Sequence, residues 1–126
     1  MKKIPEISEA EHQVMKVIWN DSPITAMEIT KELTKTTTWK LNTIKTFINR
    51  LLKKGAIGYE KSGKEYSYHP LIREADYLKT ESRLFLDRIF GGAMKPMLFT
   101  MAENEDLTLE DIEELRKHIL KKTKGR

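Results

Sequence analysis

The stretch W-K-L-N-T-I-K-T-F-I-N-R-L-L-K-K-G, from Trp39 to Gly55, separates apolar from polar side chains with a helical period. Its apolar residues recur at spacings of three and four, which is typical of a helix with one buried face. They are Ile44, Phe47, Ile48, Leu51 and Leu52. The sequence therefore predicts an amphipathic helix whose polar face stays in contact with solvent or with a partner.

The polar face of this predicted helix is rich in hydrogen-bond donors and has no acidic side chain. In the major groove of DNA, Arg and Lys pair with guanine, and Asn pairs with adenine. The composition of the face therefore indicates a recognition helix for double-stranded DNA. Its candidate DNA contacts are Asn42, Thr43, Lys45, Thr46, Asn49, Arg50 and Lys53.

The positive charge of the chain is concentrated around the same helix. The whole chain has a net charge of +4, but residues 35–64 hold eight Lys or Arg against Glu60 alone, a net +7. Residues 71–126 are neutral overall. A basic segment of this kind suits a phosphate backbone, although a solvated lysine-rich face would have the same composition.

Two short helices are predicted before the recognition helix, each with a capping box. Ser8 and Glu11 begin the first, which ends near Asn20, and Thr25 and Glu28 begin the second, after a very short strand at Ile24. A short helix, a turn and a basic amphipathic helix follow one another as in a helix-turn-helix.

After Gly55 the pattern changes to alternation, which predicts a β-hairpin. Ile57, Tyr59 and Lys61 alternate on one strand, Tyr66 and Tyr68 alternate on the other, and Ser62-Gly63 is the predicted turn. We call this hairpin, residues 57–70, the wing. Lys61 and Lys64 lie near its tip, where we expect them to contact DNA phosphates.

The last third of the chain predicts three further helices. One covers about 72–90 and ends at Gly91-Gly92, and one covers 93–102. The last begins after Thr108, which is predicted to cap it with Asp111 three residues on. The expected fold is mainly α: an N-terminal winged helix-turn-helix of three helices plus a β-hairpin wing, followed by a C-terminal helical dimerisation region. We place the DNA-binding domain at residues 1–71 and the dimerisation domain at residues 72–126.

The segment 93–102 is apolar on nearly all sides, so it should be buried all round. A second copy of the chain is the simplest partner that could cover it, which predicts a two-fold homodimer. The alternative is that this segment packs on the N-terminal domain of the same chain. The expected dimerisation residues are Phe85, Ile89, Met94, Met97, Leu98, Phe99, Ile112, Leu115 and Ile119.

Composition excludes several other classes of protein. The 126 residues contain no cysteine, so thiolate metal sites and cysteine nucleophiles are excluded. His12, His69 and His118 fall on three separate elements, which argues against a metal site. No apolar run is long enough to span a membrane. We expect a cytoplasmic protein with no cofactor, no metal and no enzymatic activity.

Four stretches taken together carry a resemblance to a known family. They are I-S-E-A-E-x-x-V-M-K-V-I-W at 7–19, W-x-x-x-T-I-K-T-x-x-N-R-L-x-K-K-G at 39–55, Y-x-Y-x-P at 66–70 and D-R-I-F-G-G at 87–92. The chain resembles the penicillinase repressors, the BlaI/MecI/CopY family of transcriptional regulators. The resemblance implies a homodimeric winged-helix repressor of antibiotic-resistance genes that binds two-fold symmetric operators, with a recognition helix at Asn42 to Lys54.

The resemblance also implies that a protease ends repression by cutting the chain in the region 93–102. Relatives usually have Asn-Phe at the cleaved bond, and the corresponding pair here is Thr100-Met101. Relatives also usually read W-S-P-K-T at the start of the recognition helix, where this chain has Lys40, Leu41 and Asn42. The copper-responsive branch needs a C-terminal cysteine cluster that this chain lacks, so release by copper is not expected.

Two other functions stay open at the level of sequence. A ligand-gated winged-helix regulator would need a roomy, partly polar pocket in its helical half, whereas the tail here is densely apolar. A winged helix used only for protein contact would not need positive charge on the recognition helix and the wing. An operator-binding repressor accounts for both features.

Overall fold

The computed structural model describes residues 3–125 and divides into two compact units, residues up to Thr80 and residues from Glu81 onward. This division falls within helix α4, Glu74–Phe90, and not at the boundary after residue 71 that the sequence suggested. The reason is that Ile72, just before α4, and Tyr77, near its start, both belong to the core of the first unit.

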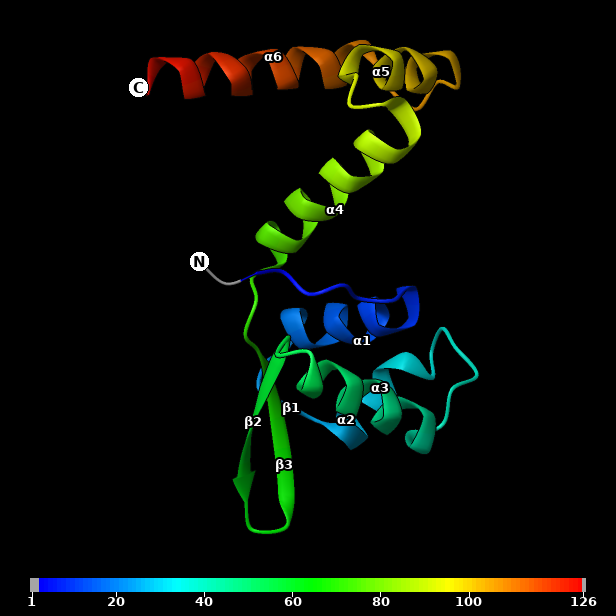
Figure 1. Ribbon diagram of the computed structural model, residues 1–126, viewed down its shortest axis with the longest axis vertical. Coiled ribbons are helices and arrows are strands. Elements are labelled where there is room, and N and C mark those ends of the chain that lie inside the picture. Colours follow the sequence, from blue (N-terminus) through cyan, green and yellow to red (C-terminus); the bar gives the residue numbers. More distant parts are fainter. Residues whose placement is uncertain (1–2, 126) are drawn as a thin grey trace. The chain divides into compact units, whose positions relative to one another are not determined.

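Three helices form the body of the first unit: α1, Glu9–Asn20; α2, Ala26–Leu33; and α3, Leu41–Lys53 (Figure 1). Both predicted capping boxes are confirmed. The Glu11 amide donates to Ser8 Oγ at 3.1 Å, and the Ser8 amide donates to the Glu11 carboxylate at 3.0 Å. Thr25 and Glu28 make the same pair of bonds at the start of α2.

Helix α3 begins without such a cap. Lys40 is its N-cap residue, and no side chain accepts a hydrogen bond from the first turn. A capping side chain typically contributes about 1 kcal/mol. The start of α3 therefore depends on the packing of its apolar face for its stability.

A small antiparallel sheet completes the first unit, with strand order β1-β3-β2. Its strands are β1, Ile24–Thr25; β2, Ile57–Ser62; and β3, Glu65–Pro70. The predicted turn at Ser62-Gly63 is wrong by one residue, because Ser62 pairs with Glu65 and leaves Gly63 and Lys64 as the loop. Gly63 has a φ of +65°, which suits the first position of a two-residue hairpin loop.

The core of the first unit is continuous from the N-terminal segment to the start of α4. Trp19 and Trp39 pack at its edge: Trp19 Nε1 donates to the Ile72 carbonyl at 2.9 Å, and the centre of the Trp39 ring lies 5.1 Å from that of Phe47. The buried apolar residues are Ile7, Val14, Met15, Ile18, Ile24, Ile29, Leu33, Ile44, Ile48, Leu51, Ala56, Ile57, Ile72 and Tyr77.

The second unit contains the end of α4 together with α5, Met94–Glu103, and α6, Leu109–Lys124. Gly91 and Gly92 both have positive φ and separate α4 from α5. Thr108 and Asp111 form a capping box on α6, as predicted. In this single chain no residue of α5 or α6 is buried, so the all-round burial expected for 93–102 is not found within one copy.

None of the helices within residues 3–125 has both the length and the apolar character needed to cross a membrane.

Candidate nucleic-acid interface

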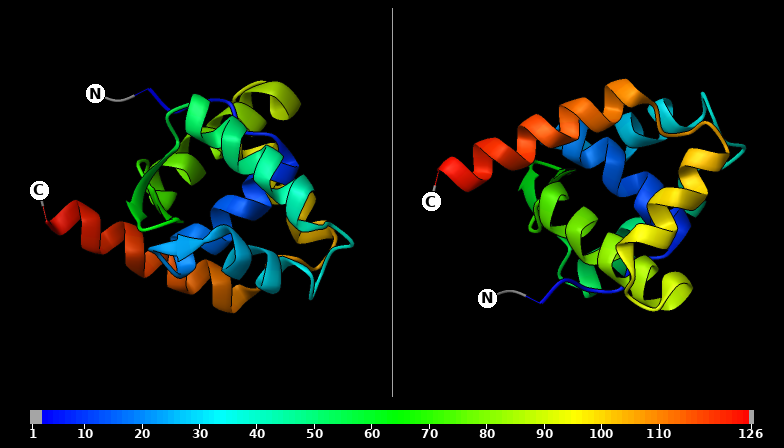
Figure 2. Two further views of the ribbon diagram at one scale, coloured as in Figure 1. Left: turned by 90° about the horizontal axis from the view of Figure 1, so that it is seen from below. Right: turned by 90° about the horizontal axis from the view of Figure 1, so that it is seen from above.

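Helix α3 presents its predicted DNA contacts on one exposed face. Ile44, Ile48 and Leu51 on the opposite face are buried, with at most 1% of their surface exposed. Figure 2, left, shows α3 crossing in front of α1, and α3 packs against both α1 and α2. The structure leaves all seven polar candidates of this helix exposed: Asn42, Thr43, Lys45, Thr46, Asn49, Arg50 and Lys53.

The exposed face of α3 has two different borders. Successive helical residues are about 100° apart around the axis, so Lys45, Asn49 and Leu52 border it on one side, and these residues line hollows shared with the wing. On the other side the Arg50 guanidinium carbon lies 6.0 Å from the centre of the Phe47 ring. This cation–π contact limits the positions that Arg50 can adopt.

Thr46 has a more restricted role than the sequence suggested. Its hydroxyl donates to the Asn42 carbonyl at 3.1 Å, one helical turn earlier. The hydroxyl proton is therefore already used. Towards DNA, Thr46 can offer its methyl group or accept a hydrogen bond, and each is a recognised contact with a base edge.

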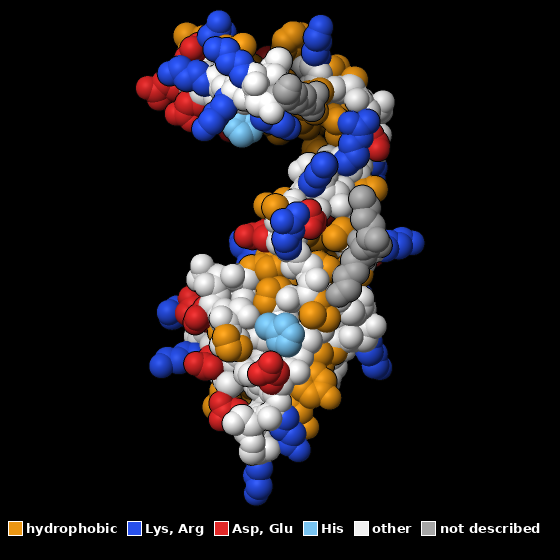
Figure 3. Space-filling view, turned by 90° about the vertical axis from the view of Figure 1, so that its left-hand side faces the viewer, with side chains coloured by type: hydrophobic (Ala, Val, Ile, Leu, Met, Phe, Trp, Pro, Cys, Tyr) orange, Lys and Arg blue, Asp and Glu red, His pale blue; other side chains and the backbone are white. Residues whose placement is uncertain are grey.

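The wing places Lys61 and Lys64 at the far end of the first unit. Both side chains are exposed, and Figure 3 shows Lys and Arg side chains projecting at its lowest point, where the tip of the hairpin lies. The Lys61 ammonium lies 5.5 Å from the centre of the Tyr66 ring. Lys64 lines the same hollow as Lys45 of α3, so the tip of the wing lies beside the polar face of α3.

Three tyrosines share one face of the wing, a grouping that the sequence reasoning did not single out as functional. Tyr59 pairs with Tyr68 and Lys61 pairs with Tyr66 across the hairpin, so these side chains point to the same side. Tyr59 and Tyr66 are exposed, and their rings are 5.3 Å apart. Burial, and then the neighbouring Tyr66, raise the pKa of Tyr68. The alternation of the two strands was the signal that could have revealed this face.

An ion pair between the partly exposed Lys54 and the buried Glu11 fixes the C-terminal end of α3, and the sequence does not predict it. Lys54, which ends α3, donates to the Glu11 carboxylate in α1, and Glu11 is only 2% exposed. Burial by itself raises the pKa of Glu11. The hydrogen bonds from Lys54 and Ser8, with the Lys54 charge, more than offset this and hold its pKa below the usual value. Forty-three residues separate the pair, so no local pattern could reveal it.

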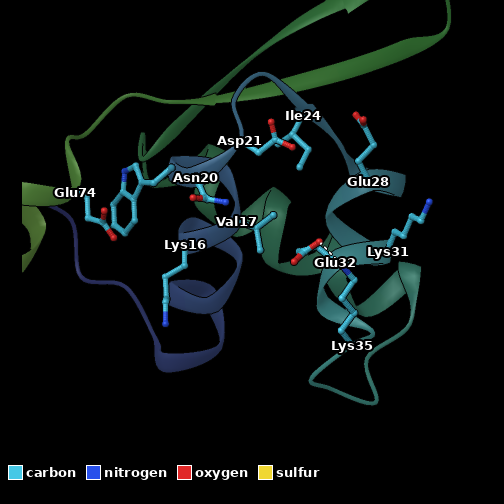
Figure 4. A pocket seen from close by; sticks show the side chains of 11 residues that line it. Lys16, Val17, Asn20, Asp21, Ile24, Glu28, Lys31, Glu32, Lys35 and Glu74 are labelled. Atoms are coloured by element: carbon cyan, nitrogen blue, oxygen red, sulfur yellow. Dashed lines mark hydrogen bonds and ion pairs between the residues drawn. The ribbon is translucent and has the colours of Figure 1, made fainter.

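A hollow of about 760 Å³ lies between α1 and α2 in the first unit (Figure 4). Carboxylates and ammonium groups both line it, and Lys35 and Glu32 form an ion pair at 3.0 Å. Within residues 3–125, no three His, Asp or Glu side chains are grouped so that they could hold a metal ion.

Known proteins resemble this chain in sequence and, over its N-terminal part, in structure. The model of the penicillinase repressor family matches residues 7–121. The penicillinase repressor of Bacillus licheniformis is 47% identical over 126 residues, covering 100% of this chain and 98% of the relative. The methicillin resistance regulatory protein MecI of Mammaliicoccus sciuri is 37% identical over 120 residues, covering 95% of this chain and 98% of that protein.

Two solved structures match the first unit. The DNA-binding domain of the repressor BlaI matches with a TM-score of 0.54 and 55% identity, covering 61% of this chain and 94% of that chain. Bacillus licheniformis BlaI, solved as a monomer in complex with the blaP half-operator, matches over the same shares with a TM-score of 0.53. The winged-helix fold, the sequence motifs and these matches agree: the chain belongs to the penicillinase repressor family.

Proposed function

We propose that this DNA-binding repressor acts as a homodimer on two-fold symmetric operators, with α3 in the major groove and the wing on flanking phosphates. The observation that carries the proposal is the exposed, acid-free polar face of α3, which is backed by a buried apolar face and bordered by the basic wing. An α-helix fits the major groove, where base edges can be distinguished.

Each part of the interface has a separate task in this proposal. Arg50, Asn49 and Asn42 carry the donor groups that can read base edges, and the lysines of the wing contact phosphates. In a dimer the two copies of α3 contact half-sites about one helical turn apart, ~10 bp, or a multiple of it. Repression then follows from occupancy of the operator, with no chemical step by the protein, in the cytoplasm where operator DNA is found.

The apolar surface of the second unit supports the homodimer. Phe85, Ile89, Met94, Phe99 and Ile119 are each between 42% and 67% exposed in the single chain. Full burial of one such side chain contributes about 1.5–3 kcal/mol. A surface of this kind favours association, and a second copy of the same helices gives a closed two-fold interface.

Relief of repression by a protease is the further part of the proposal. Thr100 and Met101 are exposed but lie within α5, where the Thr100 hydroxyl donates to the Pro96 carbonyl at 2.8 Å. We therefore expect cleavage at this bond to require local opening of the C-terminal half of α5. A cut here separates the last three residues of α5 and the whole of α6 from the wing and α3. It therefore removes α6 from the proposed dimer interface, and with it the contribution of dimerisation to operator binding.

Because the relatives include regulators of penicillinase and methicillin resistance, we expect the operators to control resistance genes of that kind. Footprinting on the DNA upstream of the protein's own gene and of neighbouring resistance genes would locate the operators. Protected half-sites whose spacing does not fit a helical turn would contradict the proposed dimer geometry.

A salt series tests DNA binding, and sedimentation tests the dimer. If each dimer neutralises ~6–10 phosphates, affinity should fall by roughly 10³–10⁵ between about 50 and 200 mM salt. A flat salt response would contradict the DNA interface. Sedimentation as a monomer at micromolar concentration would contradict the homodimer while leaving the DNA interface intact.

A further inference from the structure

The tyrosine face of the wing borders the recognition helix. Tyr59 is 55% exposed and Tyr66 is 41% exposed, although tyrosine rings carry a large apolar surface. Tyr68 beneath them packs against the core. The ring centres of Tyr59 and Tyr66 are 5.3 Å apart. Together with the half-buried Tyr68, they form an aromatic surface with two exposed hydroxyl groups.

This surface continues into α3 through two hollows. In one, of about 490 Å³, Tyr66 and Tyr68 face Lys45 of α3 and Lys64 of the wing. In the other, of about 270 Å³, all three tyrosines face Asn49 and Leu52. Lys45 and Asn49 are among the candidate DNA contacts of α3. The tyrosines therefore lie next to the proposed major-groove contacts, on their wing side.

Three lysines and two carboxylates surround these hollows, so positive charge exceeds negative charge by one, which modestly favours an anionic occupant. Lys45 and Lys64 line the larger hollow, and Lys61 is stacked on Tyr66. Two carboxylates also line the larger hollow. That of Glu28 accepts a hydrogen bond from the Thr25 amide, and Glu65 comes from the alternate set of positions on β3 that points away from the tyrosines.

A nucleic-acid backbone combines the two properties that this surface would recognise. Its deoxyribose is a compact, partly apolar ring that can pack on an aromatic face, and its phosphate oxygens accept hydrogen bonds from hydroxyl groups. We propose that Tyr59 and Tyr66 bind the sugar–phosphate backbone of the duplex beside the half-site that α3 reads. This inference rests on the proposed DNA-binding function and adds a sequence-independent contact to it.

A contact through tyrosine differs measurably from one through lysine. A phenol is neutral, so its hydrogen bond to phosphate adds affinity without replacing a counterion. Loss of the hydroxyl groups should therefore weaken binding and leave the salt dependence unchanged. Loss of a lysine should lower the slope of log affinity against log salt by about one unit.

The test uses the full chain with tyrosines 59 and 66 both changed to phenylalanine. Phenylalanine keeps the ring, so the hairpin should fold, which circular dichroism would verify. Binding is measured by fluorescence anisotropy on a labelled blaP half-operator duplex and on a random-sequence duplex. We expect the double variant to bind both duplexes about tenfold more weakly, because a hydrogen bond to a charged group is stronger than a neutral one, with an unchanged salt slope.

Two control variants isolate the effect. Ser67→Ala changes a side chain on the opposite side of the same strand and should bind like the unchanged protein. Lys64→Ala should weaken binding and lower the salt slope. If the phenylalanine variant binds within about twofold of the unchanged protein, or if its loss comes with a lower slope, the inference is overturned.

Chemical protection locates the contact directly. Nitration by tetranitromethane should modify Tyr59 and Tyr66 in the free protein, whereas Tyr77, only 5% exposed, should react little. Saturating DNA should protect the two wing tyrosines. Equal nitration with and without DNA, in a protein that binds the duplex, would overturn this inference alone. If the unchanged protein binds neither duplex, the proposed function fails and the tyrosine contact fails with it.

Discussion

The two units of this chain use apolar residues in opposite ways. In the first unit a continuous core runs from Ile7 to Tyr77, and the exposed face of α3 is polar. In the second unit Leu86 is the only buried residue among residues 81–125, and large apolar side chains are exposed along α4, α5 and α6. A unit that buries its apolar side chains can fold alone, whereas a unit that leaves them exposed gains stability when association buries them. We infer that the first unit supplies recognition and the second supplies dimerisation.

The largest effect should come from making the apolar face of α6 polar. Ile112→Gln combined with Leu115→Gln removes two apolar contacts from each copy, and each was expected to contribute about 1.5–3 kcal/mol when buried. We expect a monomer at micromolar concentration by sedimentation, and a loss of operator affinity of about 10²–10⁴ as binding of the two half-sites becomes independent.

The matched control for this variant places two glutamines on the other side of the same helix. Glu110→Gln combined with Glu114→Gln should stay dimeric and bind the operator as the unchanged chain does. A dimer that survives the apolar substitutions would show that α6 does not carry the interface.

Breaking the ion pair between Lys54 and Glu11 tests whether it stabilises the C-terminal end of α3. Lys54→Met leaves the Glu11 carboxylate buried without its cation, which should lower the free energy of unfolding by about 1–3 kcal/mol. Lys53→Met, at the neighbouring exposed position, should leave the stability nearly unchanged. Urea denaturation followed by tryptophan fluorescence would measure both variants.

The same pair predicts a dependence on pH. The pKa of Glu11 is lower in the folded chain than its ordinary value of about 4.5. The stabilisation is therefore fully present above that value and is lost as the pH falls through the lower folded pKa. Lys54→Met should reduce this loss at acidic pH. An identical pH dependence in the variant and the unchanged chain would mean that another carboxylate is responsible.

Arg50 distinguishes base reading from general attraction to DNA. Arg50→Ala should cost about 1–3 kcal/mol of binding free energy on the operator and relax the preference for one base pair. Lys64→Ala should weaken operator and random duplexes alike. Anisotropy titrations on both duplexes would separate the two effects. Equal losses for Arg50→Ala on both duplexes would make it a phosphate contact.

The smallest effect concerns the loop between α5 and α6. Glu105 has a φ of +62°, in a region that costs a non-glycine residue about 1 kcal/mol. Glu105→Gly should therefore raise the thermal midpoint of the second unit slightly. Glu103→Gly, within α5, should lower it, because glycine is a poor helix former. Calorimetry would detect both. A fall in both variants would mean that the Glu105 side chain itself stabilises the loop.

The elements that the sequence predicted well depend on local interactions. Ser8 with Glu11, Thr25 with Glu28, and Thr108 with Asp111 each join residues three apart, and the structure confirms all three caps. The buried face of α3 follows from spacing alone. The winged-helix fold and the polar face of α3 were therefore predictable from short patterns.

The missed features depend on contacts between distant parts of the chain. Glu11 is recognisable in the sequence as a capping residue, but its second partner, Lys54, is brought to it only by the packing of α1 against α3. The hairpin turn was placed one residue early because several pairings fit the same alternation, and the neighbouring strand β1 helps to fix the register.

The sequence by itself determined the recognition helix, its capped neighbours, the basic wing and the family, because helix periodicity, caps and motifs are properties of neighbouring residues. The tertiary structure alone decided which side of the wing borders α3 and that the C-terminal end of α3 pairs with α1 through Lys54 and Glu11. It also decided that α4 begins in one unit and ends in the other. Those outcomes depend on which surfaces pack together, and packing joins residues that no local pattern relates.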